Sequence, residues 1–374
     1  MAQGCALKPN TNSKFEHVYL DEHFATNATL ETDEQIFAIS PAMKEYVKVR
    51  LDPLISTKAK TRRLISDLFS QTQLDISYQH NANYYPVETF ETRVANCMSL
   101  TLLSYVLAKE AGLNTRFMNV NVEENWNVFN GITQLNGHVN LEITPAYQPG
   151  VIYPLSPNYI IDFLPMLNTK IKSKKPLNKS QIIALFYNNK GADALASGKT
   201  DLAYQYFKEA TILAPNLASL WGNLASFYRR NGYQDQAETL YKHAINLDSS
   251  NLTVKENLAL LYKLSDRPTL AIALNRQVKE KRKRNPYYHA MRAEEALFHN
   301  DPNAALKLFK KAIKLNSREH SFYFGLARAA IMREEYDRAE RFLIKARRLA
   351  ALNSEKRRYD SKISALSNLV VRAH

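Results

Sequence analysis

Apolar and small residues in the C-terminal half of the chain recur with a period of 34 residues. When residues 184–353 are aligned every 34 positions, the eighth, twentieth and twenty-seventh columns hold small side chains almost throughout. These are Gly191, Ala225, Ala259, Ala293 and Ala327; Ala203, Ala237, Ala271, Ala305 and Ala339; and Ala210, Ala244, Val278, Ala312 and Ala346. The twenty-fourth column holds Phe207, Tyr241, Asn275, Phe309 and Leu343, large apolar residues except for Asn275. Small residues let paired helices approach closely, so the pattern predicts five helix–turn–helix repeats, at 184–217, 218–251, 252–285, 286–319 and 320–353.

The turns inside these repeats also recur. The fifteenth column holds Gly198, Gly232, Asp266, Asn300 and Glu334. The first four tolerate the left-handed conformation that ends many helices. Three residues later stand Asp201, Asp235, Thr269, Asn303 and Asp337, all of which are good N-caps. The sequence therefore predicts where the first helix of each repeat ends and where the second begins.

This pattern resembles the tetratricopeptide repeat (TPR) family. In the second repeat its motif is matched by Trp221, Leu224, Ala225, Tyr228, Ala237, Tyr241 and Ala244, and in the first repeat Pro215 matches its terminal proline. The resemblance implies an all-α solenoid that binds a protein or peptide. It also implies an inner face lined by the second, fifth, ninth and twelfth positions, where we expect the partner-binding residues Asn188, Arg229, Lys263, Tyr287, Phe324 and Arg328. The alternative is that some of these contact the N-terminal domain.

The chain divides into four segments on this basis. Residues 1–34 are expected to be a tail, 35–175 a domain, 176–353 the repeat region, and 354–374 a helix that caps the open end of the solenoid. Within the domain, residues 35–70 read as helices and 76–90 as a loop. A helix is expected after Cys97, ended by Gly112, and strands at 116–122, 138–143 and 159–163. The fold class is therefore α+β followed by all-α.

Three residues in this domain form a nucleophile, base and orienter set. Cys97 stands at a predicted helix N-terminus, which favours the thiolate. His138 opens one strand and Asp162 stands among the apolar residues of the next. In such a set the histidine takes the thiol proton and the carboxylate fixes the imidazole tautomer. Glu142 is a rival orienter.

The segment around 86–162 resembles the transglutaminase-like superfamily, which has a papain-like fold with helices and an antiparallel sheet. The resemblance rests on Asn96-Cys97, Ala111-Gly112-Leu113, Gly137-His138-Val139 and Ile161-Asp162. One departure is Ala95, because the family often has glycine there. The resemblance implies a cysteine peptidase or amidase, or an acyltransferase, with Cys97, His138 and Asp162 as its triad. The alternative is a catalytically inactive scaffold that binds proteins through its repeats.

Charge and composition indicate which classes of partner and cofactor to expect. The net charge is +14, yet no nucleic-acid-binding module accompanies it, so nucleic acid is not the expected partner. Neither cysteine has metal-ligand spacing and no glycine-rich phosphate loop occurs, so no metal or cofactor is expected. Cys5 follows a small residue, as lipoprotein cysteines do. A lipid on Cys5 would be the only membrane contact and would place the protein in the bacterial envelope; otherwise it would be cytoplasmic.

Overall fold

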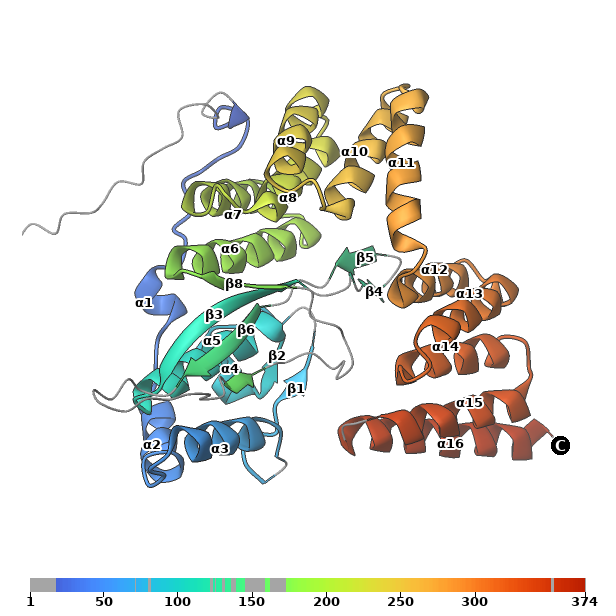
Figure 1. Cartoon of the computed structure of the whole chain (residues 1–374), viewed down its shortest axis with the longest axis horizontal. Coiled ribbons are helices and arrows are strands. Elements are labelled where there is room, and N and C mark those ends of the chain that lie inside the picture. Colours follow the sequence, from blue (N-terminus) through green and yellow to red (C-terminus); the bar gives the residue numbers. More distant parts are fainter. Residues whose placement is uncertain are drawn as a thin grey trace, which may run out of the picture. The chain divides into compact units, whose positions relative to one another are not determined.

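The chain folds into two compact units, seen here in a computed structural model (Figure 1). The structure describes residues 18–70, 72–79, 82–121, 124, 126–129, 132–135, 139–144, 159–161, 173–350 and 353–373. The first unit comprises residues 1–120, 138–163 and 174–275, and the second comprises 121–137, 164–173 and 276–374. The predicted domain boundary at 175/176 therefore does not coincide with the division between the units, which instead falls within the third repeat.

The N-terminal part of the first unit combines helices with a small sheet. Its helices are α1 (Asp33–Ile36), α2 (Pro41–Arg50), α3 (Thr57–Phe69), α4 (Pro86–Thr92) and α5 (Cys97–Glu110). Its strands are β1 (Ser77–Tyr78), β2 (Val94–Ala95), β3 (Asn114–Asn121), β6 (Val139–Thr144), β7 (Tyr159–Ile161) and β8 (Ser173–Leu177). Four of these strands form one sheet in the order β7-β6-β3-β8, in which β6 pairs antiparallel with both β3 and β7. The predicted α+β character of this part is confirmed.

Helix α5 is the central helix of this part. Asn96 caps it, because its side-chain oxygen accepts a hydrogen bond from the Ser99 N–H at 2.9 Å. Gly112, at φ +74°, follows the helix end as predicted. Ten of its fourteen residues are buried, and the helix packs against α2, α3, α4 and β6. The expected loop at 76–90 was wrong in part, since it contains β1 and α4; Pro86 supplies the fixed backbone angle that suits the first residue of a helix.

The repeat region consists of paired helices. They are α6 (Lys179–Ala196) with α7 (Thr200–Leu213), α8 (Ala218–Arg230) with α9 (Gln234–Leu247), and α10 (Leu252–Leu264) with α11 (Pro268–Arg282); then α12 (Pro286–Phe298) with α13 (Pro302–Leu315), and α14 (His320–Ile331) with α15 (Tyr336–Leu349). Four first helices begin at the predicted residue. Helix α6 begins five residues earlier, because Asn178 and Gln181 form a capping box there. The predicted capping helix is α16 (Asn353–Ala373), and it packs against α15.

The turns between paired helices confirm one prediction and correct another. All five residues of the fifteenth column have positive φ, between +52° and +89°, including Glu334. The predicted N-caps are wrong, because each second helix begins one residue before them. Asp201, Asp235 and Asp337 instead lie in the first helical turn, where a negative charge suits the helix dipole.

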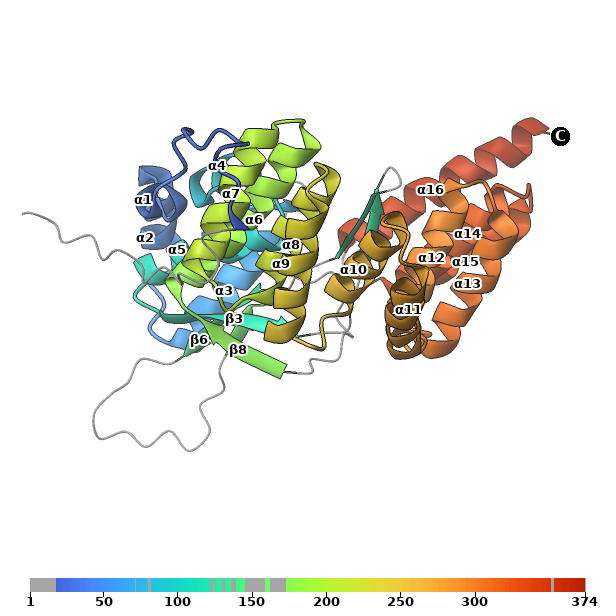
Figure 2. The same ribbon diagram turned by 90° about the horizontal axis from the view of Figure 1, so that it is seen from above.

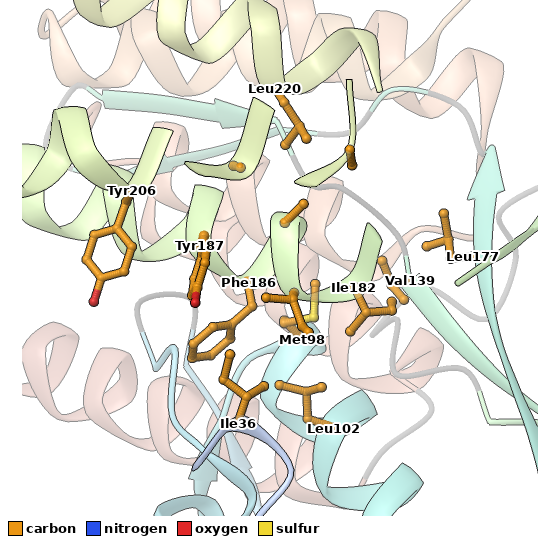
Figure 3. Packing of buried hydrophobic residues seen from close by; sticks show 14 of the residues in the cluster. Ile36, Met98, Leu102, Val139, Leu177, Ile182, Phe186, Tyr187, Tyr206 and Leu220 are labelled. Carbon is orange, nitrogen blue, oxygen red and sulfur yellow. The ribbon is translucent and has the colours of Figure 1, made fainter. Parts of the chain in front are cut away.

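Helix α6 belongs to the first repeat and also to the core of the N-terminal part (Figure 3). Its side chains Ile182 and Phe186, which are fully buried, lie in one hydrophobic cluster with Ile36, Met98 and Leu102. The cluster continues through the first two repeats and into the third, as far as Ala271. Among the described residues, one continuous apolar cluster thus joins the sheet-containing part to the solenoid in this unit.

The second unit contains α12 to α16 and a hairpin from the middle of the sequence. Strands β4 (Trp126–Phe129) and β5 (Ile132–Leu135) pair antiparallel, and β4 packs against α12. Trp126 is the first residue of β4. Beside the hairpin, Glu124 accepts hydrogen bonds from Arg282 at 2.7 and 3.0 Å and, through its carbonyl, from Asn285 at 2.6 Å. The Arg282 side chain is only 1% exposed and that of Glu124 is 22% exposed, so most of this ion pair is buried.

The third repeat departs from the pattern where the sequence predicted it would. Asn275, which replaces the large apolar residue of the twenty-fourth column, is exposed. On the same helix Ile272 is 67% exposed. The division between the two units falls directly after Asn275. The missing apolar side chain thus coincides with the end of the first continuous core. No helix among the described residues combines the length and hydrophobicity that crossing a membrane requires.

We predict that Gly325→Ala destabilises the second unit by about 1–3 kcal/mol, the usual cost of overpacking. A Cβ atom at this position would lie 2.1 Å from Cζ of Phe309, and both residues are buried. The measurement is urea unfolding followed by circular dichroism, with Ser361→Ala on the exposed face of α16 as the control. An unchanged midpoint for Gly325→Ala would contradict the packing described.

Candidate functional site

Residues 18–31, expected to be part of a tail, lie against the first two repeats in the first unit (Figure 2). The stretch precedes α1 and contains no α-helix or β-strand. Its apolar side chains Val18, Leu20 and Phe24 are buried, with Val18 only 2% exposed. The ring of Phe24 lies 4.7 Å from that of Tyr204 and 5.0 Å from that of Phe227. The repeats therefore hold this segment as they would hold an extended peptide.

Buried tyrosines bind the backbone of the segment. The Tyr204 hydroxyl accepts a hydrogen bond from the Leu20 N–H at 2.8 Å and donates one to Asp21 Oδ1 at 2.7 Å. The Tyr228 hydroxyl donates to the Val18 carbonyl at 2.8 Å. Burial raises the pKa of both phenols, so they remain neutral and able to donate over the whole physiological range. Two of these three contacts, those with Leu20 and Val18, recognise the main chain, which any sequence offers.

The second half of the segment is held by α6 and α7. The Gln205 side chain exchanges two hydrogen bonds with the backbone of Ala28, at 2.7 and 3.1 Å. Tyr187 donates to the Glu31 carbonyl at 2.6 Å, and Tyr206 donates to its carboxylate at 2.8 Å. Burial, and then the charge of Glu31, raises the pKa of Tyr187 to about 12. Sequence reasoning missed this site; its only signal was the spaced apolar residues Val18, Leu20 and Phe24 in an otherwise polar stretch.

The predicted inner-face residues of the first unit differ in exposure. Lys263 is exposed, and Asn188 and Arg229 are half-buried. Asn188 accepts a hydrogen bond from Asn223 of the next repeat at 2.7 Å, so part of its capacity is already used. None of the three predicted residues takes part in the described contacts with residues 18–31. The site that holds the segment is therefore different from the predicted inner face.

The three predicted partner-binding residues of the second unit already contact other residues of the chain. Tyr287 is 4% exposed and its ring lies 5.5 Å from that of Phe322, so it is a core residue rather than a surface one. Phe324 is half-buried, 5.7 Å from the Tyr359 ring of the capping helix α16. Arg328 is exposed and donates a hydrogen bond to Glu294 at 2.6 Å. Of the three, only Arg328 is exposed, and its guanidinium is paired with Glu294.

The predicted thiol site is described only in part. Cys97 is the first residue of α5, as predicted, and is half-buried; its sulfur lies 3.3 Å from the Tyr78 hydroxyl. Burial raises the pKa of Tyr78, and the neighbouring sulfur adds to this. His138 and Asp162 lie outside the described residues, as does Cys5.

Strand β6 begins directly after His138. One turn into α5, Thr101 donates a hydrogen bond to the Val139 carbonyl at 3.0 Å. The first turns of α5 and the start of β6 are thus tied together. Glu142, the rival orienter, is buried within β6.

A chain of polar side chains connects the Cys97 helix with the first repeat. Asn96, which caps α5, donates from its amide to Asn83. Asn83 in turn donates to Asp193 of α6 at 2.5 Å. Burial raises the pKa of Asp193, while the hydrogen bond from Asn83 opposes the shift. The conformation of the helix start is therefore coupled to α6.

The structure was also searched for side chains that could bind a metal ion, within the part of the chain that it describes. No group of three histidine, cysteine or carboxylate side chains lies close enough there to hold an ion.

Comparisons with known proteins identify the repeats. Residues 218–251 and residues 297–355 each match a family model of the tetratricopeptide repeat, so these stretches are TPR repeats. An uncharacterized protein, ycf37 of Cyanophora paradoxa, is 30% identical over 95 residues. That match covers 25% of this chain and 55% of ycf37, so the chain spans about half the length of the curated relative it matches.

Solved structures of TPR proteins are also similar, at low identity. PilF of Pseudomonas aeruginosa is 17% identical, with 53% of this chain and 94% of that chain covered and a TM-score of 0.29. YrrB, a TPR protein with an unusual peptide-binding site, is 15% identical over 47% of this chain and 90% of its own, with a TM-score of 0.26. MamA of Desulfovibrio magneticus RS-1 is 14% identical over 46% and 96%, also at 0.26.

We predict that Tyr204→Phe loosens residues 18–31, because it leaves the buried Leu20 N–H without its acceptor. An unsatisfied buried group costs about 1–3 kcal/mol. The measurement is the rate of limited proteolysis within residues 18–31. Tyr233→Phe is the matched control, since the Tyr233 ring rather than its hydroxyl contacts the segment, 5.6 Å from Phe24. Equal cleavage rates in the two variants would show that the Tyr204 hydroxyl does not hold the segment.

Proposed function

We propose that the protein is a scaffold that binds partner proteins through its tetratricopeptide repeats. One observation carries this proposal: the repeats already hold residues 18–31 through backbone hydrogen bonds and buried aromatic contacts. The same surface chemistry, tyrosine hydroxyls and amide side chains aimed at a main chain, suits an extended segment of another protein. Peptide binding by the similar repeat protein YrrB is consistent with it.

The partner site that we propose is the inner face of the repeats, apart from the surface that holds residues 18–31. In the first unit this face exposes Lys263, which places positive charge on the first helix of the third repeat. In the second unit Arg328 is exposed on the first helix of the fifth repeat, where it is paired with Glu294. Exposed cations of this kind bind carboxylates, and arginine also contacts aromatic faces. A partner segment with acidic and apolar residues would fit the surface around Lys263.

We predict that a photo-cross-linking amino acid at Lys263 captures a discrete partner in cells. Lys263→p-benzoylphenylalanine should give one dominant adduct on a denaturing gel. The same replacement at Lys58, which is exposed on α3, is the control and should not give that adduct. The captured protein, once purified, should bind the wild-type chain, and Lys263→Glu should weaken that binding about tenfold, a change of about 1.4 kcal/mol.

A scaffold also predicts that the cysteine is dispensable. The adduct should persist when Cys97→Ala is combined with the cross-linker. Identical adduct patterns from positions 263 and 58 would refute the inner-face site, and loss of the adduct in Cys97→Ala would point to a substrate rather than a partner.

The second candidate function is a thiol enzyme of the transglutaminase-like kind, acting on an amide bond. The observation that favours it is local. Cys97 opens a capped helix, and Thr101 ties that helix to the strand that follows His138. In this candidate Cys97 attacks the amide carbon, His138 takes the thiol proton and gives it to the leaving amine, and Asp162 orients the imidazole. Water then releases the acyl group, which makes the reaction a hydrolysis.

We predict for this candidate that iodoacetamide alkylates Cys97 rapidly at pH 6.5 in the folded protein. A thiolate paired with His138 would persist at that pH, whereas an ordinary thiol, with a pKa of about 8.5, would not. His138→Ala should slow alkylation about tenfold or more, and Tyr105→Phe, elsewhere on the same helix, should not. All variants are made in a Cys5→Ala background. Slow alkylation that is indifferent to His138 would eliminate the enzyme and leave the scaffold.

A further inference from the structure

Nearly all of the net positive charge lies at one end of the sequence. Residues 276–374 contain 24 lysines and arginines but 11 aspartates and glutamates, a net charge of +13 out of the +14 of the whole chain. Residues 1–275 are close to neutral. Such segregation is not needed for solubility, which mixed charges provide. It indicates an anionic partner for the fourth and fifth repeats.

Within the second unit this charge forms a face on α13. Lys307, Lys310, Lys311 and Lys314 follow one another at helical spacing, and all four are exposed. None of them has an ion-pair partner among the described residues, and α13 contains no acidic residue. Like charges three and four residues apart destabilise a helix, and the helix dipole compensates only for Lys314 in the last turn. The face therefore carries a cost that folding alone does not explain.

The fifth repeat continues the face at equivalent positions. Thirty-four residues after the four lysines stand Arg341, Ile344, Lys345 and Arg348 on α15. Arg341 and Arg348 are exposed, and Ile344 is 47% exposed. A hollow of about 470 Å³ is lined there by Ile344, Arg347, Arg348 and Lys356. We call these positions on α13 and α15 the basic face.

The first repeat shows what the same helix face can hold. The positions equivalent to Lys307 and Lys310 are Gln205 and Lys208 of α7. Gln205 bonds the backbone of Ala28, and Lys208 bonds both carboxylate oxygens of Asp21 at 2.7 and 2.8 Å. In this protein, a lysine at that position of a second helix therefore binds a carboxylate of an extended chain segment.

We propose that the basic face of α13 and α15 is a docking site for an extended, acidic segment of a partner protein. Carboxylates of the segment would bond the α13 lysines and the α15 arginines, and one apolar side chain would contact Ile344. The contacts of residues 18–31 with α7 favour a polypeptide over a nucleic acid or a lipid surface. Ile344 and Leu315 are the exposed large apolar residues of α15 and α13, and two such residues offer little to a bilayer. This inference rests on the proposed function, because it assigns a partner class to the repeats.

The experiment measures fluorescence anisotropy with the full chain and a labelled 16-residue peptide of alternating Glu and Ser with Leu at its centre. Replacing four lysines, Lys307→Gln, Lys310→Gln, Lys311→Gln and Lys314→Gln, should weaken binding at least tenfold. The matched control replaces the exposed Lys44, Lys48, Lys58 and Lys199 with Gln, which changes net charge equally. It should change binding less than twofold. The same peptide with Gln for Glu should bind at least tenfold more weakly to the wild type.

Several outcomes would overturn the proposal. One is equal weakening by the two fourfold variants. Another is binding of duplex DNA, or of phosphatidylserine vesicles, that depends on the α13 lysines while the acidic peptide does not bind. If the α13 variant fails to fold by circular dichroism, Arg341→Gln with Arg348→Gln replaces it, under the same criteria. An adduct at position 263 that persists in the α13 variant would show that failure here does not extend to the proposed function.

Discussion

The packing of α6 is the interaction on which the rest of the first unit depends. One face of this helix pairs with α7 as the start of a solenoid, and another supplies Ile182 and Phe186 to the cluster that contains Met98 and Leu102 of α5. A helix apolar on more than one side must be buried on more than one side. The solenoid therefore grows directly from the core of the sheet-containing part, and the polar chain from Asn96 to Asp193 adds a directional contact to the non-directional apolar ones.

The segment at residues 18–31 uses the same junction in a different way. It crosses from the second repeat back to α6, with its apolar side chains buried and its backbone bonded by tyrosines. A chain without regular secondary structure must satisfy its backbone groups elsewhere. Here tyrosine and glutamine side chains of the repeats satisfy several of them. The repeats thus bind a segment of their own chain by the contacts that we propose for a partner.

The sequence allowed the repeats to be predicted in detail because a 34-residue period samples each structural position five times. In the structure, small residues such as Ala203 are buried and the turn residues have positive φ. The exceptional Asn275 is exposed. The N-terminal part could be predicted only in outline, because each of its elements occurs once. The docking of residues 18–31 could not be predicted, since Leu20 and Tyr204 are 184 residues apart and nothing local marks their pairing. The thiol site remains a prediction, because two of its three residues lie outside the described parts.

The buried ion pair of the second unit has a consequence for how the protein is made. Glu124 and Arg282 are 158 residues apart, and Glu124 leaves the ribosome first. At synthesis rates of about 5–20 residues per second, Glu124 waits about 8–30 s for its partner. During that interval β4 and β5 have no α12 to pack on, because α12 follows Arg282 in the chain. The second unit can therefore close only late in translation, and the hairpin is the segment that must be kept from pairing with other chains until then.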